Sequence, residues 1–354
     1  MLTTTPTMQP DYSRQRLLKE VGAAGQATLA RSRVLIVGAG GLGSPVLQYL
    51  AGAGVGYLSL VDADDLDASN LHRQPLYALA DVGKPKVALA KAAVSRLNPE
   101  VRVETHAIRF TADNALALVR EHDVVVDCSD NFLTKFLIND AAVLAQRPAV
   151  FASVYQYEGQ LQVYQPSPTH ACLRCLWPEA TVDGVVGNCA DAGVLGPVPG
   201  AFGALEALLT LKILLNLSGR LEGELLLLDF ASFNATKLKA ARRPDCAAPG
   251  CALIRELKRE EPDIEVRMAS LTAAREQHFE LIDVRTAEEF AAQPTEARHV
   301  PMTSLLADPK LLEFGPHYLL VCASGKRSLA AARELRKRGL DARSLAGGLQ
   351  SLAG

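Results

Sequence analysis

The stretch from residue 33 to residue 74 constrains the fold more than any other part of the chain. Its first apolar run, Val34 to Val37, is bounded by charge and glycine, as is typical of a buried strand in a parallel sheet. A helical stretch, Ser44 to Ala53, and a second apolar run, Tyr57 to Val61, follow it. The sequence therefore predicts a strand–turn–helix–strand unit in an open α/β sheet.

Glycines fill the turn between the first strand and the helix. Gly38, Gly40 and Gly43 have GxGxxG spacing, and Gly41 is added between them. Such glycines let backbone N–H groups approach a phosphate at a helix N-terminus. Asp62 follows the second strand, where an acidic residue would meet a ribose hydroxyl. These residues predict a nucleotide site, and a nicotinamide dehydrogenase fits them equally well.

The residues after the second strand favour ATP over a dinucleotide. Ser69 to Gln74, SNLHRQ, place the guanidinium of Arg73 just beyond that strand. A bidentate cation suits phosphates that bring no counter-ion of their own. Lys86 lies in the first turns of the next predicted helix, Asp81 to Leu97.

A third buried strand brings an acidic group to the same edge of the predicted sheet. Residues 123 to 128, DVVVDC, end at Ser129, Asp130 and Asn131. In open α/β sheets ligands bind beyond the carboxyl ends of the strands, so we expect Asp130 in the same crevice as the glycine loop. A carboxylate there can hold a magnesium ion on the phosphates.

Composition and charge exclude several classes of protein. The chain has 354 residues, of which 49% are hydrophobic, and a formal net charge of -2, so no global field favours nucleic acid. We expect no membrane span, because no apolar run approaches the roughly 20 residues that a bilayer requires. Seven cysteines, an odd number, without an apolar signal segment indicate reduced thiols in a cytoplasmic protein.

Two cysteine pairs are candidates for a metal site. Cys172 and Cys175 form a CxxC pair, and Cys246 and Cys251 form a wider one. Four thiolates in two short loops suit tetrahedral zinc, whereas a redox CxxC or buried filler is the alternative. Cys189 lies on a glycine-rich loop before an apolar stretch that we predict to be helical. It is either an accessible thiolate or an inert, partly buried thiol.

The composition changes at residues 255 to 263, a charged run with a proline that predicts a linker. Beyond it, the apolar strand Tyr318 to Val321 runs into Cys322 and a loop that leads to a predicted helix, Leu329 to Lys337. The helix dipole, Lys326 and Arg327 favour a thiolate at Cys322. Cys322 is therefore a nucleophile or part of an anion cradle, and phosphatases use a related loop.

These motifs, taken in order, resemble a known family. GAGGLG, Asp62, SNLHRQ, GKPKV, DCSDN, CLRC and NCADAGVLGP resemble the ubiquitin-activating-like (ThiF/MoeB-type) adenylyltransferases that activate the sulfur carriers of molybdopterin and thiamine synthesis. DVRTAEEF, CASGKRS and LAGGLQS resemble a rhodanese domain. The resemblance implies a Rossmann-like adenylation domain with a mixed sheet and zinc site at residues 11 to 251 and a small α/β rhodanese domain at 264 to 354. Residues 252 to 263 would be a linker, and we expect residues 1 to 10 to be disordered.

The resemblance also implies roles for matching positions. Asp130 would carry Mg²⁺, Arg14 would be lent across a homodimer interface to the partner's ATP, and Cys322 would carry a persulfide. Cys189 matches a loop cysteine that some members use covalently. The residues implied to bind ATP and its metal are Gly41, Asp62, Ser69, Asn70, Arg73, Lys86, Asp130 and Asn131.

The implied partners are a ubiquitin-like sulfur carrier ending in Gly-Gly and a sulfur donor, either a persulfide or thiosulfate. The sequence leaves two other functions open. One is activation of a ubiquitin-like protein for conjugation through a thioester on Cys189. The other is an NAD-dependent oxidoreductase.

Overall fold

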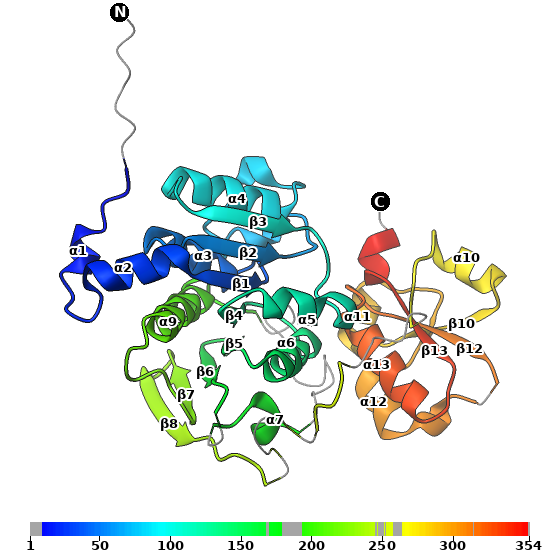
Figure 1. Cartoon of the computed structure of the whole chain (residues 1–354). Coiled ribbons are helices and arrows are strands. Elements are labelled where there is room, and N and C mark those ends of the chain that lie inside the picture. The colour runs from blue at the N-terminus through cyan, green and yellow to red at the C-terminus, as the bar shows by residue number, and fades with distance from the viewer. Residues whose placement is uncertain are drawn as a thin grey trace, which may run out of the picture. The chain divides into compact units, whose positions relative to one another are not determined.

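The computed structural model describes residues 9–167, 170–178, 193–244, 246, 251, 253–257, 264–313 and 315–352 (Figure 1). These residues group into two compact units, one through residue 257 and one from residue 264. Most of the predicted disordered N-terminus lies outside the described residues, and so does Cys189. The domain boundaries at residues 251 and 264 stay a prediction.

A mixed eight-stranded sheet is the frame of the first unit, in the order β3-β2-β1-β4-β5-β6-β7-β8. The strands from β3 to β5 pair in parallel, and those from β5 to β8 pair antiparallel. The mixed sheet that the resemblance implied is therefore confirmed. The strands are β1 (Arg33–Val37), β2 (Tyr57–Val61), β3 (Arg102–His106), β4 (Val124–Asp127), β5 (Ala149–Tyr155), β6 (Glu158–Tyr164), β7 (Glu224–Asp229) and β8 (Asn234–Lys239).

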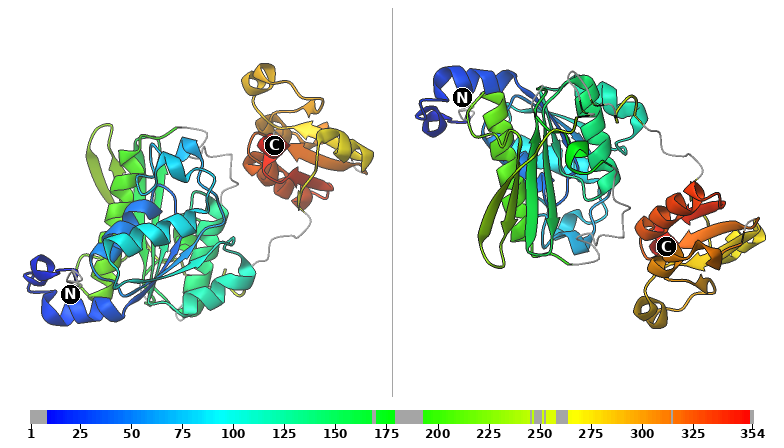
Figure 2. Two further views of the ribbon diagram at one scale, coloured as in Figure 1. Left: turned by 90° about the horizontal axis from the view of Figure 1, so that it is seen from above. Right: turned by 90° about the horizontal axis from the view of Figure 1, so that it is seen from below.

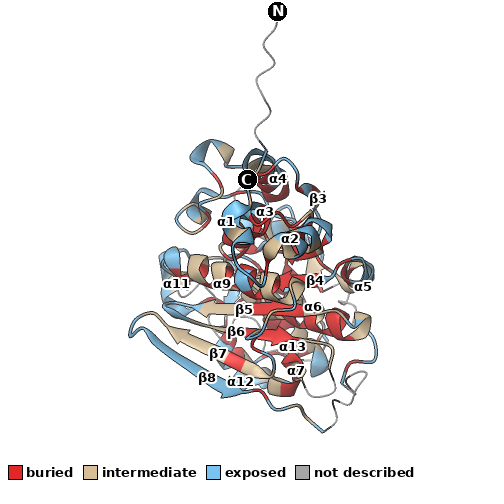
Figure 3. Ribbon diagram, turned by 60° about the vertical axis from the view of Figure 1, so that its left-hand side comes forward, coloured by how far each residue is buried: buried red, intermediate tan, exposed pale blue. Residues whose placement is uncertain are grey.

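Helices cover both faces of this sheet (Figures 1 and 2). Alternate residues of β1 enter two separate cores, Val34 and Ile36 on one face and Leu35 and Val37 on the other. The central strands are thus buried on both faces, as Figure 3 shows in red. The helices are α1 (Ser13–Arg16), α2 (Gly22–Arg31), α3 (Gly43–Gly52), α4 (Lys86–Leu97), α5 (Ala112–Arg120), α6 (Phe132–Ala145), α7 (Leu173–Leu176) and α9 (Pro197–Leu214), with 3₁₀ turns η1 (Ala68–Asn70) and η2 (Leu79–Asp81).

One helix begins later than the sequence predicted, and two strands were not predicted. Helix α4 begins at Lys86 instead of Asp81, because Pro85 occupies the N-cap with a non-helical ψ of 124° and Asp81 ends a separate 3₁₀ turn. Strands β7 and β8 were not predicted. All six residues of β8 are exposed, so the strand has no buried face to reveal it.

Helix α9 has the length and composition of a membrane span. In this fold it packs against α3 and the strands β4, β5 and β6. It buries Phe202 but also Glu206 and Thr210. The structure therefore uses α9 as the core helix of the first unit.

The second unit is a five-stranded parallel sheet in the order β11-β10-β12-β13-β9. The strand that we predicted at residues 318 to 321 is confirmed. The elements are β9 (Glu265–Val266), α10 (Leu271–Glu276), β10 (Phe279–Asp283), α11 (Ala287–Ala292), β11 (Arg298–His299), α12 (Met302–Ala307), η3 (Pro309–Leu311), β12 (His317–Val321), α13 (Lys326–Lys337), β13 (Ala342–Leu345) and η4 (Gly348–Leu352).

Candidate functional site

The predicted nucleotide residues gather at the carboxyl ends of three neighbouring strands. Val37 at the end of β1 pairs with Val61 of β2 on one side and with Asp127 of β4 on the other. The glycine loop follows β1, Asp62 follows β2, and residues 129 to 131 follow β4. Strand pairing therefore brings together three segments that are far apart in the sequence.

The glycine loop passes so close to β4 that it excludes side chains. Gly38 has a positive φ of 102°, and a Cβ on it would lie 2.4 Å from the carbonyl oxygen of Cys128. A Cβ on Gly43 would lie 2.2 Å from the carbonyl oxygen of Gly38. The N-cap of α3 is Leu42, whose side chain makes no capping hydrogen bond. Within its first turn, Ser44 donates its amide to the carbonyl oxygen of Gly40 and Pro45 has no N–H. The donors suited to a phosphate oxygen are therefore the backbone amides of residues 40 to 43.

Asp62 fixes the glycine loop from the second strand. Its Oδ2 accepts a 2.7 Å hydrogen bond from the amide of Ala39, and its Oδ1 accepts one of 2.8 Å from the amide of Asp64. Burial raises the pKa of Asp62, and the charge of Lys86 opposes this shift. Lys86 itself is buried and donates to the Asp64 carboxylate at 3.0 Å. The predicted phosphate-binding lysine thus lies beside the predicted ribose-binding aspartate.

Hydrogen bonds shape the turn that carries Arg73. The amide of Ser69 donates to the carboxylate of Asp67 at 2.7 Å. The amide of Asp67 in turn donates to the side-chain oxygen of Asn70 at 3.3 Å. The Arg73 guanidinium donates to the carbonyl oxygen of Ser69 at 3.0 Å. The last residue of the motif, Gln74, is buried, and its Oε1 has no hydrogen-bond partner among the described residues. Sequence reasoning gave Gln74 no role, although it closes the SNLHRQ motif.

A buried ion pair supports the segment that follows β4. Lys135 on α6 donates to the carboxylate of Asp127, and both side chains are buried. Asp127 also accepts hydrogen bonds from the amide and hydroxyl of Ser129, at 3.1 and 2.5 Å. Asn131 caps α6 by accepting from the amide of Thr134 at 2.8 Å. This arrangement leaves Asp130 exposed at the carboxyl edge, on a segment that is held from both sides.

Arg14 lies at the opposite edge of its own sheet. Helix α1 packs on α2, and the Tyr12 ring is so close to Gly54 that a Cβ there would lie 2.7 Å from it. Gly54 precedes the amino end of β2, whereas the nucleotide residues follow its carboxyl end. Five residues of extended strand separate these ends by about 17 Å. Arg14 is exposed. Because α1 lies beside the amino end of β2, Arg14 is far from the glycine loop of its own chain.

Three cysteines form a buried cluster that could hold a metal ion. Their sulfur atoms lie within 4.8 Å of one another, with 3.9 Å between Cys172 and Cys175 and 3.9 Å between Cys172 and Cys246. The hydrogen bond with Cys172 lowers the pKa of Cys175. Cys251 is buried in the same hydrophobic core. The two cysteine pairs that the sequence singled out are therefore neighbours in the fold.

The cysteine cluster is tied to α6, the helix that Asn131 caps. Arg174, between the first two cysteines, donates to both oxygens of Asp140 at 2.7 and 2.6 Å. The amide of Leu173 donates to Asn139 at 2.8 Å. Helix α6 thus connects the cluster to the segment that carries Asp130.

In the second unit, Cys322 lies at the carboxyl end of β12 and is fully buried. Its sulfur lies 3.4 Å from both the amide nitrogen and the hydroxyl of Ser328 in the first turn of α13. The amide of Leu349 donates to the Cys322 carbonyl oxygen at 2.8 Å, so the LAGGLQS segment helps to hold the loop in place. The structure thus places the predicted nucleophile in a strand–loop–helix cradle.

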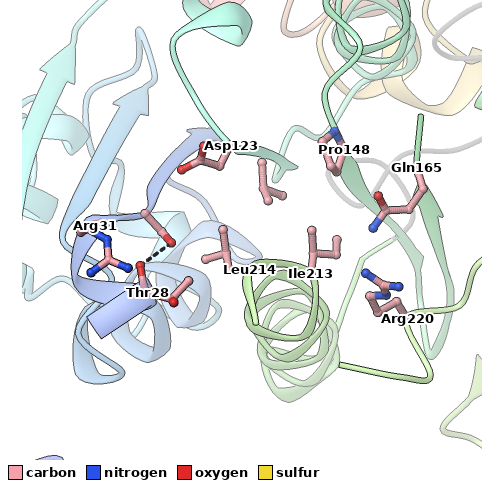
Figure 4. Close-up of a pocket in the computed structure, with 10 residues that line it drawn as sticks. Thr28, Arg31, Asp123, Pro148, Gln165, Ile213, Leu214 and Arg220 are labelled. Atoms are coloured by element: carbon pink, nitrogen blue, oxygen red, sulfur yellow. Dashed lines mark hydrogen bonds between the residues drawn. The ribbon is translucent and has the colours of Figure 1, made fainter. Parts of the chain in front are cut away.

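A cavity lies at the other edge of the first unit (Figure 4). Its volume is about 490 Å³, and Ser32, Asp123 and Pro148, among the residues that line it, precede the strands β1, β4 and β5. This cavity is at the amino ends of these strands, so it is separate from the predicted nucleotide site.

Comparisons with known proteins agree with this arrangement. The model of the ThiF family matches residues 12–248, and that of the rhodanese-like domain matches residues 268–354. A sulfur carrier protein adenylyltransferase of Thermus thermophilus is 47% identical over 243 residues, which cover 68% of this chain and 90% of that protein. An adenylyltransferase and sulfurtransferase MOCS3 of Aedes aegypti is 38% identical over 376 residues, which cover 96% of this chain and 85% of that protein.

Solved structures show the same fold for the first unit. The crystal structure of MccB from E. coli has a TM-score of 0.59 and 26% identity, and covers 71% of this chain and 74% of that chain. The ThiF model spans more than half of the chain, and the relative from Aedes aegypti is matched along almost all of it. The chain therefore belongs to the ThiF family and carries a rhodanese-like domain at its C-terminal end.

Proposed function

We propose that this chain uses ATP to adenylate the C-terminal carboxylate of a ubiquitin-like sulfur carrier and then converts it to a thiocarboxylate with sulfur from Cys322. The observation that carries the proposal is the pairing of two different strand–loop–helix cradles in one chain. One is the glycine-rich loop from Gly38 to Gly43, and the other contains the buried thiol of Cys322. The relatives named above are adenylyltransferases, and one is also a sulfurtransferase.

The adenylation step follows from charge. A carboxylate oxygen of the carrier attacks the α-phosphorus of ATP, and pyrophosphate leaves with the bonding electron pair. The backbone amides of residues 40 to 43, together with Arg73 and Lys86, would stabilise the phosphate charge. Mg²⁺ at Asp130 would neutralise further phosphate charge when bound. Catalysis is then mainly a matter of positioning, which the hydrogen bonds around Asp62 and Asp127 support.

Sulfur transfer follows in two steps. The terminal sulfur of a Cys322 persulfide attacks the acyl carbon, AMP leaves, and carrier and enzyme are joined through an acyl disulfide. A second thiolate, such as that of Cys189, then attacks the Cys322 sulfur and releases the carrier thiocarboxylate, which leaves a disulfide between the two cysteines. A cellular thiol would reduce this disulfide, and a persulfide or thiosulfate donor would reload Cys322.

We propose that the cysteine cluster holds zinc. Zinc–sulfur bonds of about 2.3 Å in a tetrahedron place the sulfur atoms about 3.8 Å apart, close to the observed 3.9 Å. Cys172, Cys175 and Cys246 would supply three ligands and the adjacent Cys251 the fourth. Zinc in such a site is structural, so it would stabilise the region that supports α6.

We further propose a cytoplasmic homodimer in which Arg14 of one subunit reaches the ATP of the other. The support is the position of α1 at the edge of its own sheet remote from the glycine loop. The net charge of -2 supports a protein partner over nucleic acid, and we propose no membrane association.

A reconstitution with purified components tests the proposed function. We expect ATP–pyrophosphate exchange only with a carrier that ends in Gly-Gly, and thiocarboxylate formation, detected by mass spectrometry, only after a sulfur donor is added. A carrier lacking its last two glycines is the matched control. Transfer of the carrier from a stable Cys189 thioester to another protein, without thiocarboxylate, would contradict the proposal and favour conjugation.

A further inference from the structure

Arg327 in the Cys322 loop is engaged by a carboxylate from another helix. The sequence led us to expect that this guanidinium would support the Cys322 thiolate directly. Instead its Nη1 and Nη2 donate to the two oxygens of Glu289, at 2.7 and 2.6 Å. This two-pronged pair is the geometry in which arginine binds carboxylates most strongly.

Glu289 is fixed independently of Arg327. It lies in the first turn of α11, where its carboxylate accepts from the amide of Thr286 at 2.9 Å and its own amide donates to the Thr286 hydroxyl at 3.3 Å. The residue before this capping box, Arg285, is itself held by two bonds to the buried Asp283. The carboxylate is therefore positioned in advance, and it draws the guanidinium to itself.

This pair changes the charge that an incoming sulfur donor meets. The loop from Cys322 to Ser328 contains two cations, Lys326 and Arg327. With Arg327 paired to Glu289, less positive charge remains in the loop to balance a thiolate at Cys322. Thiosulfate is a dianion, so the thiolate repels it more strongly when the loop has less positive charge than the sequence suggests. A donor of net charge -1 is repelled less.

We propose that Glu289 is a specificity-determining residue that makes Cys322 select a persulfide donor over thiosulfate. The inference rests on the proposed role of Cys322 as the sulfur carrier. With a persulfide, the Cys322 thiolate attacks the outer sulfur, the S–S bond of the donor breaks, and the donor leaves as a thiolate. With thiosulfate, the same attack releases sulfite. The two reactions give the same enzyme persulfide, so they differ in the charge of the donor and leaving group.

The test compares two donors on three variants of the full chain. Rapid-quench mass spectrometry measures the second-order rate of Cys322 persulfide formation with thiosulfate and with cysteine persulfide. Glu289→Gln removes the charge but keeps a side chain that can complete the capping box. We expect it to raise the thiosulfate rate on the order of tenfold and to leave the cysteine persulfide rate within about twofold.

Two further variants make the result specific to the ion pair. Glu288→Gln removes the same charge from the neighbouring position of α11 and keeps the bonds between Glu289 and Arg327, so we expect little change with either donor. Glu289→Gln combined with Arg327→Gln should return the thiosulfate rate to the wild-type value or below. An unchanged donor ratio in Glu289→Gln, or an equal rise in Glu288→Gln, would overturn the inference. If Cys322→Ala still makes thiocarboxylate, the proposed function itself fails, whatever the donor ratio.

Discussion

The chain contains two loops of similar design that differ in what fills them. Each follows a buried parallel strand and enters the N-terminus of a helix, α3 in the first unit and α13 in the second. The first loop is lined by glycines, and a Cβ at Gly38 or Gly43 would overlap backbone atoms. The second holds the side chain of Cys322 at its centre. One loop is therefore suited to bind a large anion and the other to form a covalent bond to sulfur.

The loops also differ in how much they depend on the rest of the fold. The first takes its charged groups from distant segments, including Asp62, Arg73, Lys86 and Asp130. The second is completed within its own unit by Ser328, Leu349 and Glu289. Distant changes in the first unit should therefore affect adenylation and leave loading of Cys322 with sulfur intact.

The largest effect is expected from removal of the thiol in the second loop. Cys322→Ala should abolish thiocarboxylate formation, because no other group in that cradle can form a persulfide. Carrier-dependent ATP–pyrophosphate exchange should remain at the wild-type level, since it takes place in the first loop. Both activities are measured on the same preparation. Loss of exchange in this variant would contradict the separation of the two loops.

The reciprocal variant alters the first loop. Asp130→Ala should lower carrier-dependent exchange by about a thousandfold, because it removes the carboxylate that would hold Mg²⁺ against the phosphates. Persulfide formation on Cys322 with a sulfur donor should be unchanged. Asp130 is exposed, so its removal should leave the melting temperature near that of the wild type. Near-wild-type exchange over a range of Mg²⁺ concentrations would refute the metal role.

A smaller effect on exchange activity is expected from mixing subunits, because Arg14 of one subunit would bind the ATP at the first loop of the other. Arg14→Ala and Asp130→Ala homodimers should each be nearly inactive in exchange. After verified subunit exchange, an equal mixture should regain about a quarter of wild-type activity, because half of the dimers then have one intact site. Absence of any recovery would show that Arg14 does not act across subunits.

The metal site should affect stability more than chemistry. Wild-type protein should contain one zinc per chain, and Cys175→Ala should lose it together with roughly 3 kcal/mol of the free energy of unfolding of the first unit. Because α6 connects the cluster to Asp130, exchange activity should fall as the metal is chelated. Metal analysis and thermal unfolding check this prediction. Wild-type protein that is metal-free and equally stable would remove zinc from the site.

The sequence predicted the central strands of both units because each is a short apolar run bounded by glycine or charge. It located the glycine loop, Asp62, Asp130 and Cys322 correctly at strand ends, since that position follows from the strand assignment alone. It failed for β8, whose six residues are all exposed. Without a buried face, alternating hydrophobicity gives no signal, and the strand exists because β7 offers it backbone partners.

The sequence also could not reveal side-chain pairs between distant elements. Lys135 and Asp127 are eight residues apart on a strand and a helix, and nothing in the pattern shows that their charges meet in the core. Likewise, Arg327 was assigned to the thiolate because it lies in the same loop, whereas the fold pairs it with Glu289. Such pairings depend on tertiary geometry, which residue spacing along the chain does not contain.

The smallest expected effect concerns the protonation of Glu289. The hydrogen bonds from Arg327 hold the pKa of Glu289 down to about 2, below the value of about 4.3 for a free glutamate. Because the folded-state pKa is depressed, the pair contributes its full stability above about pH 4.3, and this contribution disappears as the pH falls towards 2. The Glu289 side chain is 37% exposed, so solvent screening limits the contribution to about 1 kcal/mol or less.

A carbon-13 titration of glutamate-labelled protein checks this protonation. The Glu289 carboxyl signal, assigned by its absence in Glu289→Gln, should remain that of a carboxylate at pH 3. In Arg327→Gln, where the opposing guanidinium is gone, the same signal should titrate near pH 4.3. A wild-type Glu289 that titrates at the ordinary value would mean that the pair is open in solution. The guanidinium of Arg327 would then be available to the Cys322 loop, and that loop would present one more cation to its donor.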